Sequence, residues 1–444
     1  MKEKEKEKLS VVSWNVTRKC NLRCGHCYLP AVSAGDGVFD SSNGDELSTS
    51  EALRLIDEIR LVNPETLLII SGGEPLLRPD VFELASHARK AGMMVVVGTN
   101  GTLLDGPAAR KLKESGVSGV SIGLDSAGPV HHDAVRGCPG AWAAAVEAAG
   151  LCRAQGIEVQ VNTVVTSGNL EEIPELIEFA RALGAKVFSP FFLVCTGRAE
   201  EMTDITPSQY EEVLSLIAGL SGNSGQMMIR TRCAPTIRRI LHAKAPDSPL
   251  LQMDAGRCLA GRTYCRIAPD GTVTACPYLP LPLGNARGGE FGRIWEPQKS
   301  PVLESLRAGA RDLKGKCGAC RYRLLCGGCR ARAYAMRRDY LGEDPWCAYR
   351  PAPGEAETEA VRPPTVDNEY NELPYSTPTW SREADDRLLR VPFFVRPMVK
   401  AAVERYAMER GCLEITPEIM DEVKGRMRRP AMNGHGNSNS KTHS

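Results

Sequence analysis

The chain has 444 residues, with 55 Lys and Arg against 54 Asp and Glu, and 42% of its residues are hydrophobic. This length and apolar content fit a soluble protein of two or three domains, and the near-neutral charge gives no reason to expect a nucleic-acid partner. No apolar run reaches the roughly 18 residues of a membrane helix, and the charged start has no hydrophobic signal region, so we expect a cytoplasmic protein without membrane contact. Sixteen cysteines at ligand-like spacings fit metal binding in a reducing compartment better than disulfides.

Strands and helices alternate through the first two hundred residues. After a strand-like run from Leu9 to Val16, the pattern predicts strands over 66–70, 93–97, 117–124, 158–165 and 185–192, and helices over 53–59, 81–91, 108–114, 141–154 and 171–183. This alternation is typical of parallel βα units with right-handed crossovers, and six units make an open, partial (βα)6 barrel of the TIM type. Ligands bind such α/β folds at the carboxyl ends of the strands.

Three cysteines form a Cys-x3-Cys-x2-Cys loop directly after the first strand, at Cys20, Cys24 and Cys27. Each thiolate can bind one iron of a [4Fe-4S] cluster, which leaves the fourth iron with an open position for an amino acid's carboxylate and amine. The alternative is a zinc loop, because Cys-x2-Cys pairs also suit tetrahedral zinc.

Other candidate ligand contacts follow later strands. Gly72-Gly73-Glu74-Pro75 comes after the strand over 66–70, and its glycines allow the backbone to approach a ligand closely, although a simple strand-to-helix turn has the same pattern. Further polar residues at strand ends are either ligand contacts or ordinary caps: Thr99, Asn100, Asp125 and Asn162.

The cysteine loop, the aromatic Tyr28 after it and the Gly-Gly-Glu-Pro segment about fifty residues later resemble the radical S-adenosylmethionine (SAM) superfamily. The resemblance implies that the loop's cluster binds SAM and cleaves it to methionine and a 5'-deoxyadenosyl radical, using a low-potential electron donor such as ferredoxin or flavodoxin. It also implies that Gly72, Gly73, Glu74 and Pro75 contact the SAM amino group. We expect further cofactor contacts from Tyr28, and from Thr99, Asn100, Asp125 and Asn162 if these strand-end residues are more than caps.

A second segment of the resemblance is Gly123-Leu-Asp-Ser followed by His132-Asp-x-x-Arg136-Gly. By this match Arg136 would pair with the SAM carboxylate, a role that suits its planar fork of donors. The family commonly has Ser at the position of Gly123, so a hydroxyl contact to SAM is lost here or comes from a neighbour.

Eight cysteines lie between residues 258 and 347, which is enough for two fully ligated [4Fe-4S] clusters. The region resembles the SPASM extension of radical SAM enzymes. The resemblance assigns one auxiliary cluster to Cys258, Cys265, Cys276 and Cys329, and the other to Cys317, Cys320, Cys326 and Cys347. Only two residues lie between Cys326 and Cys329, where the family usually has three, which weakens the assignment of Cys329 to the first cluster. One alternative is a cluster with an open iron and with Cys265 unused. Two zinc ribbons are another. Cysteines outside these sets are interpreted as small buried residues: Cys138, Cys152, Cys195, Cys233 and Cys412.

Basic residues crowd the same region, at Arg311, Lys314, Lys316, Arg321, Arg323, Arg330, Arg332, Arg337 and Arg338. They either neutralise the charge of the clusters or form a cleft for a polycarboxylate such as a porphyrin. The segment from Phe191 to Arg198 resembles the tetrapyrrole-modifying branch of the superfamily.

We therefore expect a radical SAM barrel over 1–230, a SPASM domain over 231–350, a linker over 351–378, a small helical domain over 379–429 and a disordered tail over 430–444. The segments around Trp380, Val391 and Ile415 resemble the C-terminal domain of light-independent protochlorophyllide reductase, which suggests a docking or substrate-recognition module.

The favoured hypothesis is a radical SAM oxidoreductase or lyase that modifies a tetrapyrrole side chain of a haem precursor. One rival is a SPASM-type enzyme that modifies a peptide or protein side chain. The other is a non-catalytic iron-sulfur or zinc scaffold that docks partners.

Overall fold

The computed structural model describes residues 8–29, 32–33, 46–201, 205–220, 227–246, 248, 251, 258–355, 360–362, 378–392, 396–410, 412 and 414–428. They belong to two compact units, Met1–Pro364 and Thr365–Ser444. Most of the predicted linker and all of the predicted tail lie outside the described residues. Within the described part of the chain, no helix combines the length and the apolar character needed to cross a membrane.

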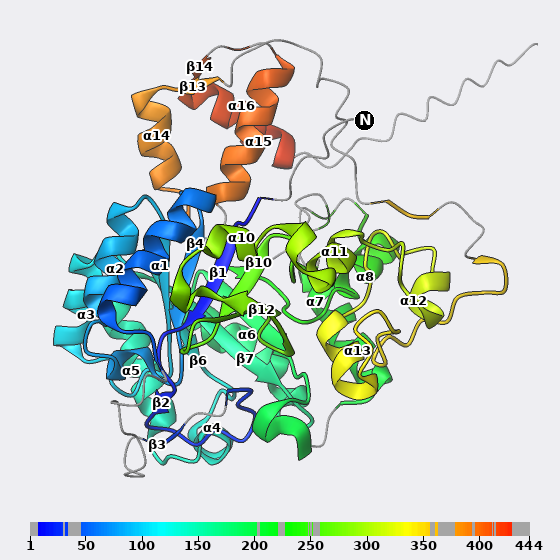
Figure 1. The fold of residues 1–444 in the computed structure, drawn as a ribbon, viewed down its shortest axis with the longest axis horizontal. Helices are drawn as coiled ribbons and strands as arrows, with labels where there is room; N and C mark the ends of the chain where they lie inside the picture. Colours follow the sequence, from blue (N-terminus) through cyan, green and yellow to red (C-terminus); the bar gives the residue numbers. More distant parts are fainter. Residues whose placement is uncertain are drawn as a thin grey trace, which may run out of the picture. The chain divides into compact units, whose positions relative to one another are not determined.

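The first unit is organised around one curved ten-stranded sheet in the order β12-β11-β10-β1-β4-β5-β6-β7-β8-β9 (Figure 1). Neighbouring strands from β10 to β9 are parallel, whereas β10, β11 and β12 pair in antiparallel fashion. The strands are β1 (Val11–Asn15), β4 (Leu67–Ser71), β5 (Met94–Thr99), β6 (Gly119–Gly123), β7 (Glu158–Val165), β8 (Val187–Phe192), β9 (Met228–Ile229), β10 (Tyr264–Ile267), β11 (Thr272–Cys276) and β12 (Leu279–Asn285), with a separate pair β2 (Lys19–Cys20) and β3 (Val32–Ser33).

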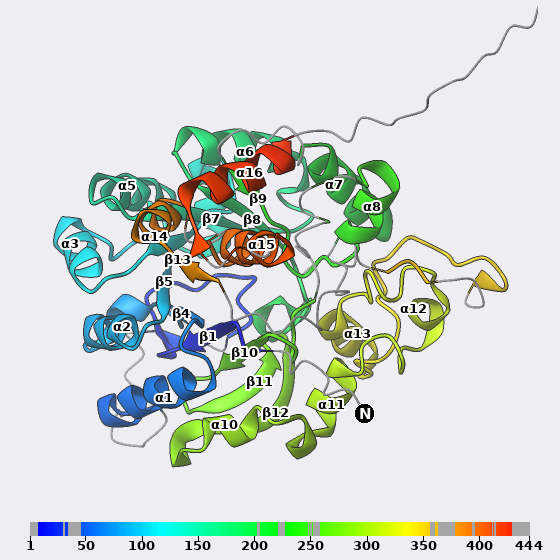
Figure 2. The same ribbon diagram turned by 90° about the horizontal axis from the view of Figure 1, so that it is seen from above.

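Helices form an arc around the outer face of this sheet, as Figure 2 shows for α1, α2, α3, α5 and α6. Several begin at ordinary caps: Ser48 and Glu51 form a capping box at α1, and Asp105 accepts a hydrogen bond at the start of α3. The helices of this unit are α1 (Thr49–Val62), α2 (Val81–Lys90), α3 (Gly106–Glu114), α4 (Pro129–Arg136), α5 (Ala141–Ala154), α6 (Ile173–Ala182), α7 (Pro207–Leu220), α8 (Ile237–Lys244), α10 (Phe291–Ile294), α11 (Pro301–Arg307), α12 (Gly315–Ala319) and α13 (Arg330–Arg337).

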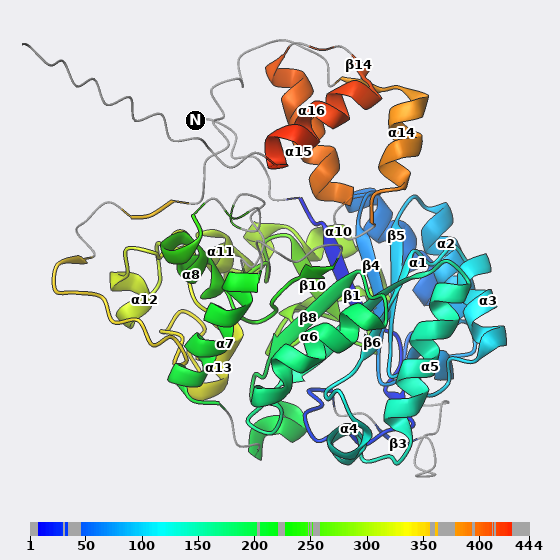
Figure 3. The ribbon, with the colours of Figure 1, turned by 180° about the vertical axis from the view of Figure 1, so that it is seen from behind.

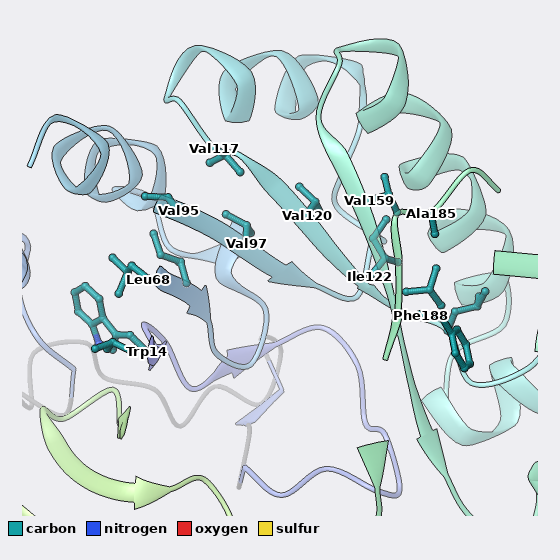
Figure 4. Packing of buried hydrophobic residues seen from close by; sticks show 14 of the residues in the cluster. Trp14, Leu68, Val95, Val97, Val117, Val120, Ile122, Val159, Ala185 and Phe188 are labelled. Carbon is teal, nitrogen blue, oxygen red and sulfur yellow. The ribbon is translucent and has the colours of Figure 1, made fainter. Parts of the chain in front are cut away.

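The main core lies between the sheet and these helices. Buried and partly exposed residues alternate without exception along β7, so one face of the strand packs under the helices and the other faces the inside of the curved sheet. Figure 4 shows Val95, Val97, Val120 and Val159 among the side chains of this layer. The inner face is therefore left for ligands.

The predicted α/β fold with six βα units is confirmed, with element ends shifted by a few residues. Two features were not predicted. The short helix α4 follows β6, and together with β3 it lies at the end of the sheet where the parallel strands finish (Figures 1 and 3). The second feature is that the cysteine-rich region continues the barrel sheet, because Tyr264–Ile267 pair with Val11–Trp14 in β1.

The second unit is a small helical domain with its own core. It contains β13 (Thr379–Trp380), α14 (Arg382–Leu389), α15 (Arg396–Glu409), β14 (Glu414–Ile415) and α16 (Pro417–Arg428). Ala384, Val403, Ala407 and Ile415 are buried in it. The predicted helical pattern of this region is thus present.

Candidate active site

The cysteine loop lies at the carboxyl end of the strands, where Gly72 and Gly73 hold it in place. Gly73 N–H donates to Thr17 O (2.8 Å), and Glu74 N–H donates to Lys19 O (2.8 Å). A Cβ on Gly73 would lie 2.2 Å from Lys19 O, so only glycine allows this approach. The close backbone contact that we expected for a ligand is thus made to the chain leading into Cys20.

The three thiols of the loop gather in one small cluster, formed by Cys20, Leu22 and Cys24 with Cys27 and Cys138 against it. All are free thiols. Burial raises the pKa of Cys20 to about 11 and also raises the pKa of Cys27. Such thiols become ligands when a metal replaces their protons, and Leu22 N–H already donates to Cys20 Sγ (3.4 Å).

Glu74 is fully buried and serves as a brace between strands. Its carboxylate accepts hydrogen bonds from Thr99 Oγ1 (2.8 and 2.9 Å), Asn100 N–H (2.8 Å) and Leu76 N–H (3.1 Å). Burial nevertheless raises the pKa of Glu74 to about 7. The structure thus brings Glu74, Thr99 and Asn100 together, while Pro75 begins the short 3₁₀ helix that follows.

Arg136 extends from α4 across Gly123 toward the cysteine loop. Its guanidinium lies 2.9 Å from Asp125 Oδ2, and Nη1 donates to Cys24 Sγ (3.9 Å). A Cβ at position 123 would come within 2.4 Å of Arg136 Nη2. Gly123 therefore leaves the space that the Arg136 guanidinium occupies.

Asp125 stays ionised despite full burial. Burial by itself would raise its pKa, but the charge of Arg136, the nearby His26 and the hydrogen bond from Val164 N–H together outweigh it, so the pKa of Asp125 is lowered. His26, a residue that sequence reasoning missed, approaches the same carboxylate at 3.7 Å. Burial lowers the pKa of His26 to about 4, so this imidazole is neutral near pH 7. Arg136 and Asp125 are thus a charged pair directly beside the cysteine loop.

The segment Phe191–Arg198 supports the cysteine loop from the opposite side. Arg198 Nε donates to Cys24 O (2.9 Å), and Arg198 N–H donates to Cys27 O (3.1 Å). A Cβ on Gly197 would lie 2.7 Å from Tyr28 O, so this position also requires close packing. Arg198 was part of the tetrapyrrole-like segment, but its role in holding the loop had no local signal.

Tyr28 connects the cysteine loop with the cysteine-rich region. Its hydroxyl accepts a hydrogen bond from Asn15 Nδ2 (3.1 Å), and its ring packs edge-on against Tyr278, with centroids 5.0 Å apart. Asn162 lies on the inner face of β7, where its side-chain oxygen accepts from Gln160 Nε2 (2.7 Å). Tyr28 and Asn162 thus reach the interior that the thiol trio faces.

The first auxiliary group differs from the expected set. Cys258, Cys276 and Cys329 pack in one hydrophobic cluster, and Cys233 packs there with them. Cys265 does not join this group, because the pleat of β10 turns it into the main core beside Ile267. Cys265 thus lies apart from the other three cysteines of the expected set, and Cys233 packs with them.

The four cysteines of the expected second auxiliary group, Cys317, Cys320, Cys326 and Cys347, line one cavity. Backbone N–H groups donate to three of the sulfurs, from Tyr322 to Cys320 (3.3 Å), from Gly328 to Cys326 (3.4 Å) and from Asp344 to Cys317 (3.4 Å). Four thiols around a cavity with N–H donors suit a [4Fe-4S] cluster, because such bonds stabilise the charge on cluster sulfur.

Several of the basic residues of this region have structural partners. Arg332 pairs with Asp344 (3.2 Å) inside the protein, Lys314 pairs with Asp339 (2.8 Å), and Arg337 pairs with Glu343 (3.1 Å). Arg330 Nη2 donates to Cys317 Sγ (3.8 Å). Carboxylates thus balance the charges of Lys314, Arg332 and Arg337, whereas Arg330 lies beside a candidate cluster thiol.

Comparison with known proteins gives the family. The radical SAM superfamily profile matches residues 14–180, and the SPASM iron-sulfur cluster-binding domain matches 258–321. The AdoMet-dependent heme synthase of Methanosarcina barkeri is 39% identical over 349 residues, covering 77% of this chain and 97% of that protein. The chain belongs to the radical SAM superfamily.

Further radical SAM relatives lie in the same branch. The AdoMet-dependent heme synthase of Nitratidesulfovibrio vulgaris is 38% identical and covers 77% of this chain and 92% of that protein. The pre-heme d1 synthase of Dinoroseobacter shibae is 32% identical, and the match covers 76% of this chain and 85% of that protein. Residues 380–424 match the family described as the proto-chlorophyllide reductase 57 kD subunit.

Solved structures have the same radical SAM fold. Streptococcus suis SuiB bound to S-adenosylmethionine superposes with a TM-score of 0.60 at 16% identity, covering 77% of this chain and 78% of that chain. The anSMEcpe structure with bound AdoMet superposes with a TM-score of 0.58 at 20% identity, and the match covers 76% of this chain and 94% of that chain. The free thiols packed together at two places and lining a cavity at a third fit the iron-sulfur clusters that this family carries.

Proposed function

We propose that this radical SAM enzyme modifies a carboxylate-bearing side chain of a haem-precursor tetrapyrrole. The relatives named as heme and pre-heme d1 synthases support the ring system. The observation that carries the substrate class is a pair of arginines, Arg230 and Arg232, on the inner side of the last parallel strand.

Cys20, Cys24 and Cys27 would hold the [4Fe-4S] cluster, which when bound would supply the electron chemistry for reductive cleavage of SAM. Arg136 would bind the SAM carboxylate, because its guanidinium already lies beside Cys24 Sγ. Asp125 fixes the orientation of Arg136, and Gly123 leaves room for it. Glu74 holds the ends of β4 and β5 together below the loop.

Arg230 and Arg232 extend the strand β9 along β8. Arg230 N–H donates to Phe188 O (2.9 Å), and Arg232 N–H donates to Pro190 O (2.8 Å). Met227 and Ile229 are buried in the core under the helices, so the alternating arginines lie on the face turned away from it. This is the inner face of the curved sheet.

The two guanidinium groups have no carboxylate partner among the described residues. The charge of Arg232, together with burial, lowers the pKa of Arg230 to about 9, which reflects two close cations in a poorly solvated place. An anion that binds both would relieve this repulsion. The acidic arms of a porphyrin have the required charge and the planar carboxylate geometry that guanidinium groups bind well.

We further propose that the auxiliary clusters carry electrons between the substrate and a low-potential donor or acceptor such as ferredoxin or flavodoxin. The contact between Tyr28 and Tyr278 supports this, since it joins the thiol trio to the first auxiliary group through packed side chains. A reducing cytoplasm is the compartment that fits sixteen cysteines without a disulfide partner.

The test is SAM cleavage by anaerobically reconstituted enzyme with dithionite, with three additions compared. Iron coproporphyrin III carries propionate arms, whereas iron octaethylporphyrin has the same porphyrin macrocycle with ethyl groups in place of carboxylate-bearing arms. A glycine-rich peptide tests the rival function as a peptide maturase. We expect 5'-deoxyadenosine formation to rise several-fold only with the propionate-bearing porphyrin, with a mass change of the porphyrin.

Three results would contradict the proposal. Equal stimulation by octaethylporphyrin would remove the role of carboxylates, stimulation by peptide alone would favour the maturase, and no SAM cleavage under any condition would leave only the scaffold. Mycofactocin maturases are relatives at 29–30% identity, which makes the peptide arm of the experiment necessary.

A further inference from the structure

We propose that Cys233 is the fourth protein ligand of the first auxiliary cluster, together with Cys258, Cys276 and Cys329, and that Cys265 is not a ligand. The inference concerns which thiolates surround one cluster. It does not depend on the substrate proposed above.

Packing places Cys233 with the other three cysteines. Cys233, Cys258 and Cys276 are partly buried side chains of the hydrophobic cluster that contains Cys329. Cys233 follows the bridge between Arg232 and Phe191 at one edge of the sheet, whereas Cys276 ends β11 near the other edge. The curvature of the sheet thus brings thiols from its two edges to the same place.

A buried polar network fixes Cys233 relative to Cys329. Arg332 Nη2 donates to Cys233 O (2.7 Å), and Arg332 Nη1 lies 3.2 Å from Asp344 Oδ2. The same carboxylate oxygen accepts a hydrogen bond from Cys329 N–H (2.8 Å). Both cysteines are therefore held by one ion pair, which is the kind of support that orients metal ligands.

Cys265 lies on the wrong face of β10 for this site. In the parallel pairing of β10 with β1, Cys265 is opposite Val12 and Ile267 is opposite Trp14. All four side chains are 0% exposed in the core under the helices. Tyr264 and Arg266 occupy the other face, so the strand backbone separates the Cys265 thiol from the group formed by the other cysteines.

The backbone at Cys233 also favours a specific role for its side chain. Its φ is +56°, in the left-handed region, where glycine is preferred and few non-glycine residues occur. Glycine would satisfy this conformation with less strain if packing alone decided the residue. Strain that is retained at a thiol within a group of thiols points to ligation.

Four thiolates satisfy the four irons of one cubane cluster, so this cluster would have no open iron. Each thiol gives its proton to solvent as its Fe–S bond forms, and no redox change of the protein is needed.

The test uses the full chain with Cys20, Cys24 and Cys27 changed to Ala, so that only auxiliary clusters remain. Cys233→Gly removes the thiol and relieves the left-handed strain. Cys265→Ala and Cys265→Val are the matched controls, because they also remove a buried thiol. Each protein is reconstituted anaerobically, and iron content, the EPR spectrum after reduction and ¹³C-cyanide hyperfine coupling are measured.

We expect the Cys265 variants to keep the iron content and spectrum of the parent. In Cys233→Gly we expect either loss of about half of the iron or a retained cluster with an altered EPR signal and new cyanide coupling at an open iron. The metal-free Cys233→Gly chain should unfold at the same temperature as the parent or higher. An unchanged cluster in Cys233→Gly, or cluster loss in a Cys265 variant that folds like the parent, would overturn the assignment.

Discussion

The buried ion pair between Arg332 and Asp344 gives a prediction with a defined magnitude. The Arg332 side chain is 2% exposed and that of Asp344 is fully buried, and their closest atoms are 3.2 Å apart. Asp344→Asn keeps an oxygen to accept from Cys329 N–H but leaves the guanidinium charge without its partner. Removing one member of a buried pair typically costs about 3–5 kcal/mol, a large part of the roughly 5–15 kcal/mol by which a domain is stable.

The assay is urea unfolding of the metal-free chain, followed by circular dichroism. Asp339→Asn is the matched control, because Asp339 pairs with Lys314 at the surface and such pairs contribute about 0–1 kcal/mol. The double variant Arg332→Met with Asp344→Asn should regain part of the loss, since it leaves no unpaired buried charge. The reasoning is refuted if Asp344→Asn costs no more than Asp339→Asn, or if the double variant is less stable than both single variants.

Three further predictions concern the site. Gly123→Ser should displace the arginine that crosses this position and weaken SAM binding about tenfold or more, which calorimetry with reconstituted enzyme measures. His132 Nδ1 accepts from Asp125 N–H (3.1 Å), and burial lowers the pKa of His132 to about 4. Below about pH 6.5, His132 binds a proton more readily in the unfolded protein than in the folded protein. The free energy of unfolding should therefore fall by up to roughly 3 kcal/mol between pH 7 and 4. This fall should be smaller in His132→Asn. Changing Arg230 and Arg232 together to Gln should weaken binding of a propionate-bearing porphyrin about 10- to 100-fold.

Each of these predictions has a control in the chain. Gly128→Ala adds a Cβ that meets nothing within 4 Å, so it should leave SAM affinity unchanged. For the histidine, equal pH profiles of parent and variant would contradict the assigned shift. Arg293→Gln removes a surface cation that pairs with Glu290, and equal loss of porphyrin binding in that variant would indicate a nonspecific charge effect.

The sequence was sufficient for features that depend on local order. Periodicity predicted the alternating strands and helices, since each βα unit repeats one pattern, and strand β7 matches its predicted bounds. The thiol trio is also local, because Cys20, Cys24 and Cys27 lie on one loop. The pairing of β10 with β1 was not predictable in this way, because it joins residues about 250 positions apart.

The spacing of cysteines along the sequence was not enough to predict which of them lie together in the first auxiliary group. The resemblance to the SPASM extension grouped Cys265 with Cys258 and Cys276, but the direction of a strand side chain depends on the pleat. A signal was present, because Ile267 two residues later is apolar and shares the face of Cys265. For Cys233 and for the space at Gly123 no local pattern exists, since both depend on segments distant in sequence, such as Arg332 and Arg136.

The pairing of β10 with β1 also means that the barrel cannot be separated from the residues that follow it. β1 is flanked by β4 on one side and by β10 on the other. A protein truncated before Tyr264 would leave the N–H and C=O groups along Val11–Asn15 open on that side, a ready template for intermolecular strand addition. We therefore expect the N-terminal two hundred residues, when synthesised alone, to aggregate more readily than a chain that extends through β10 and β11.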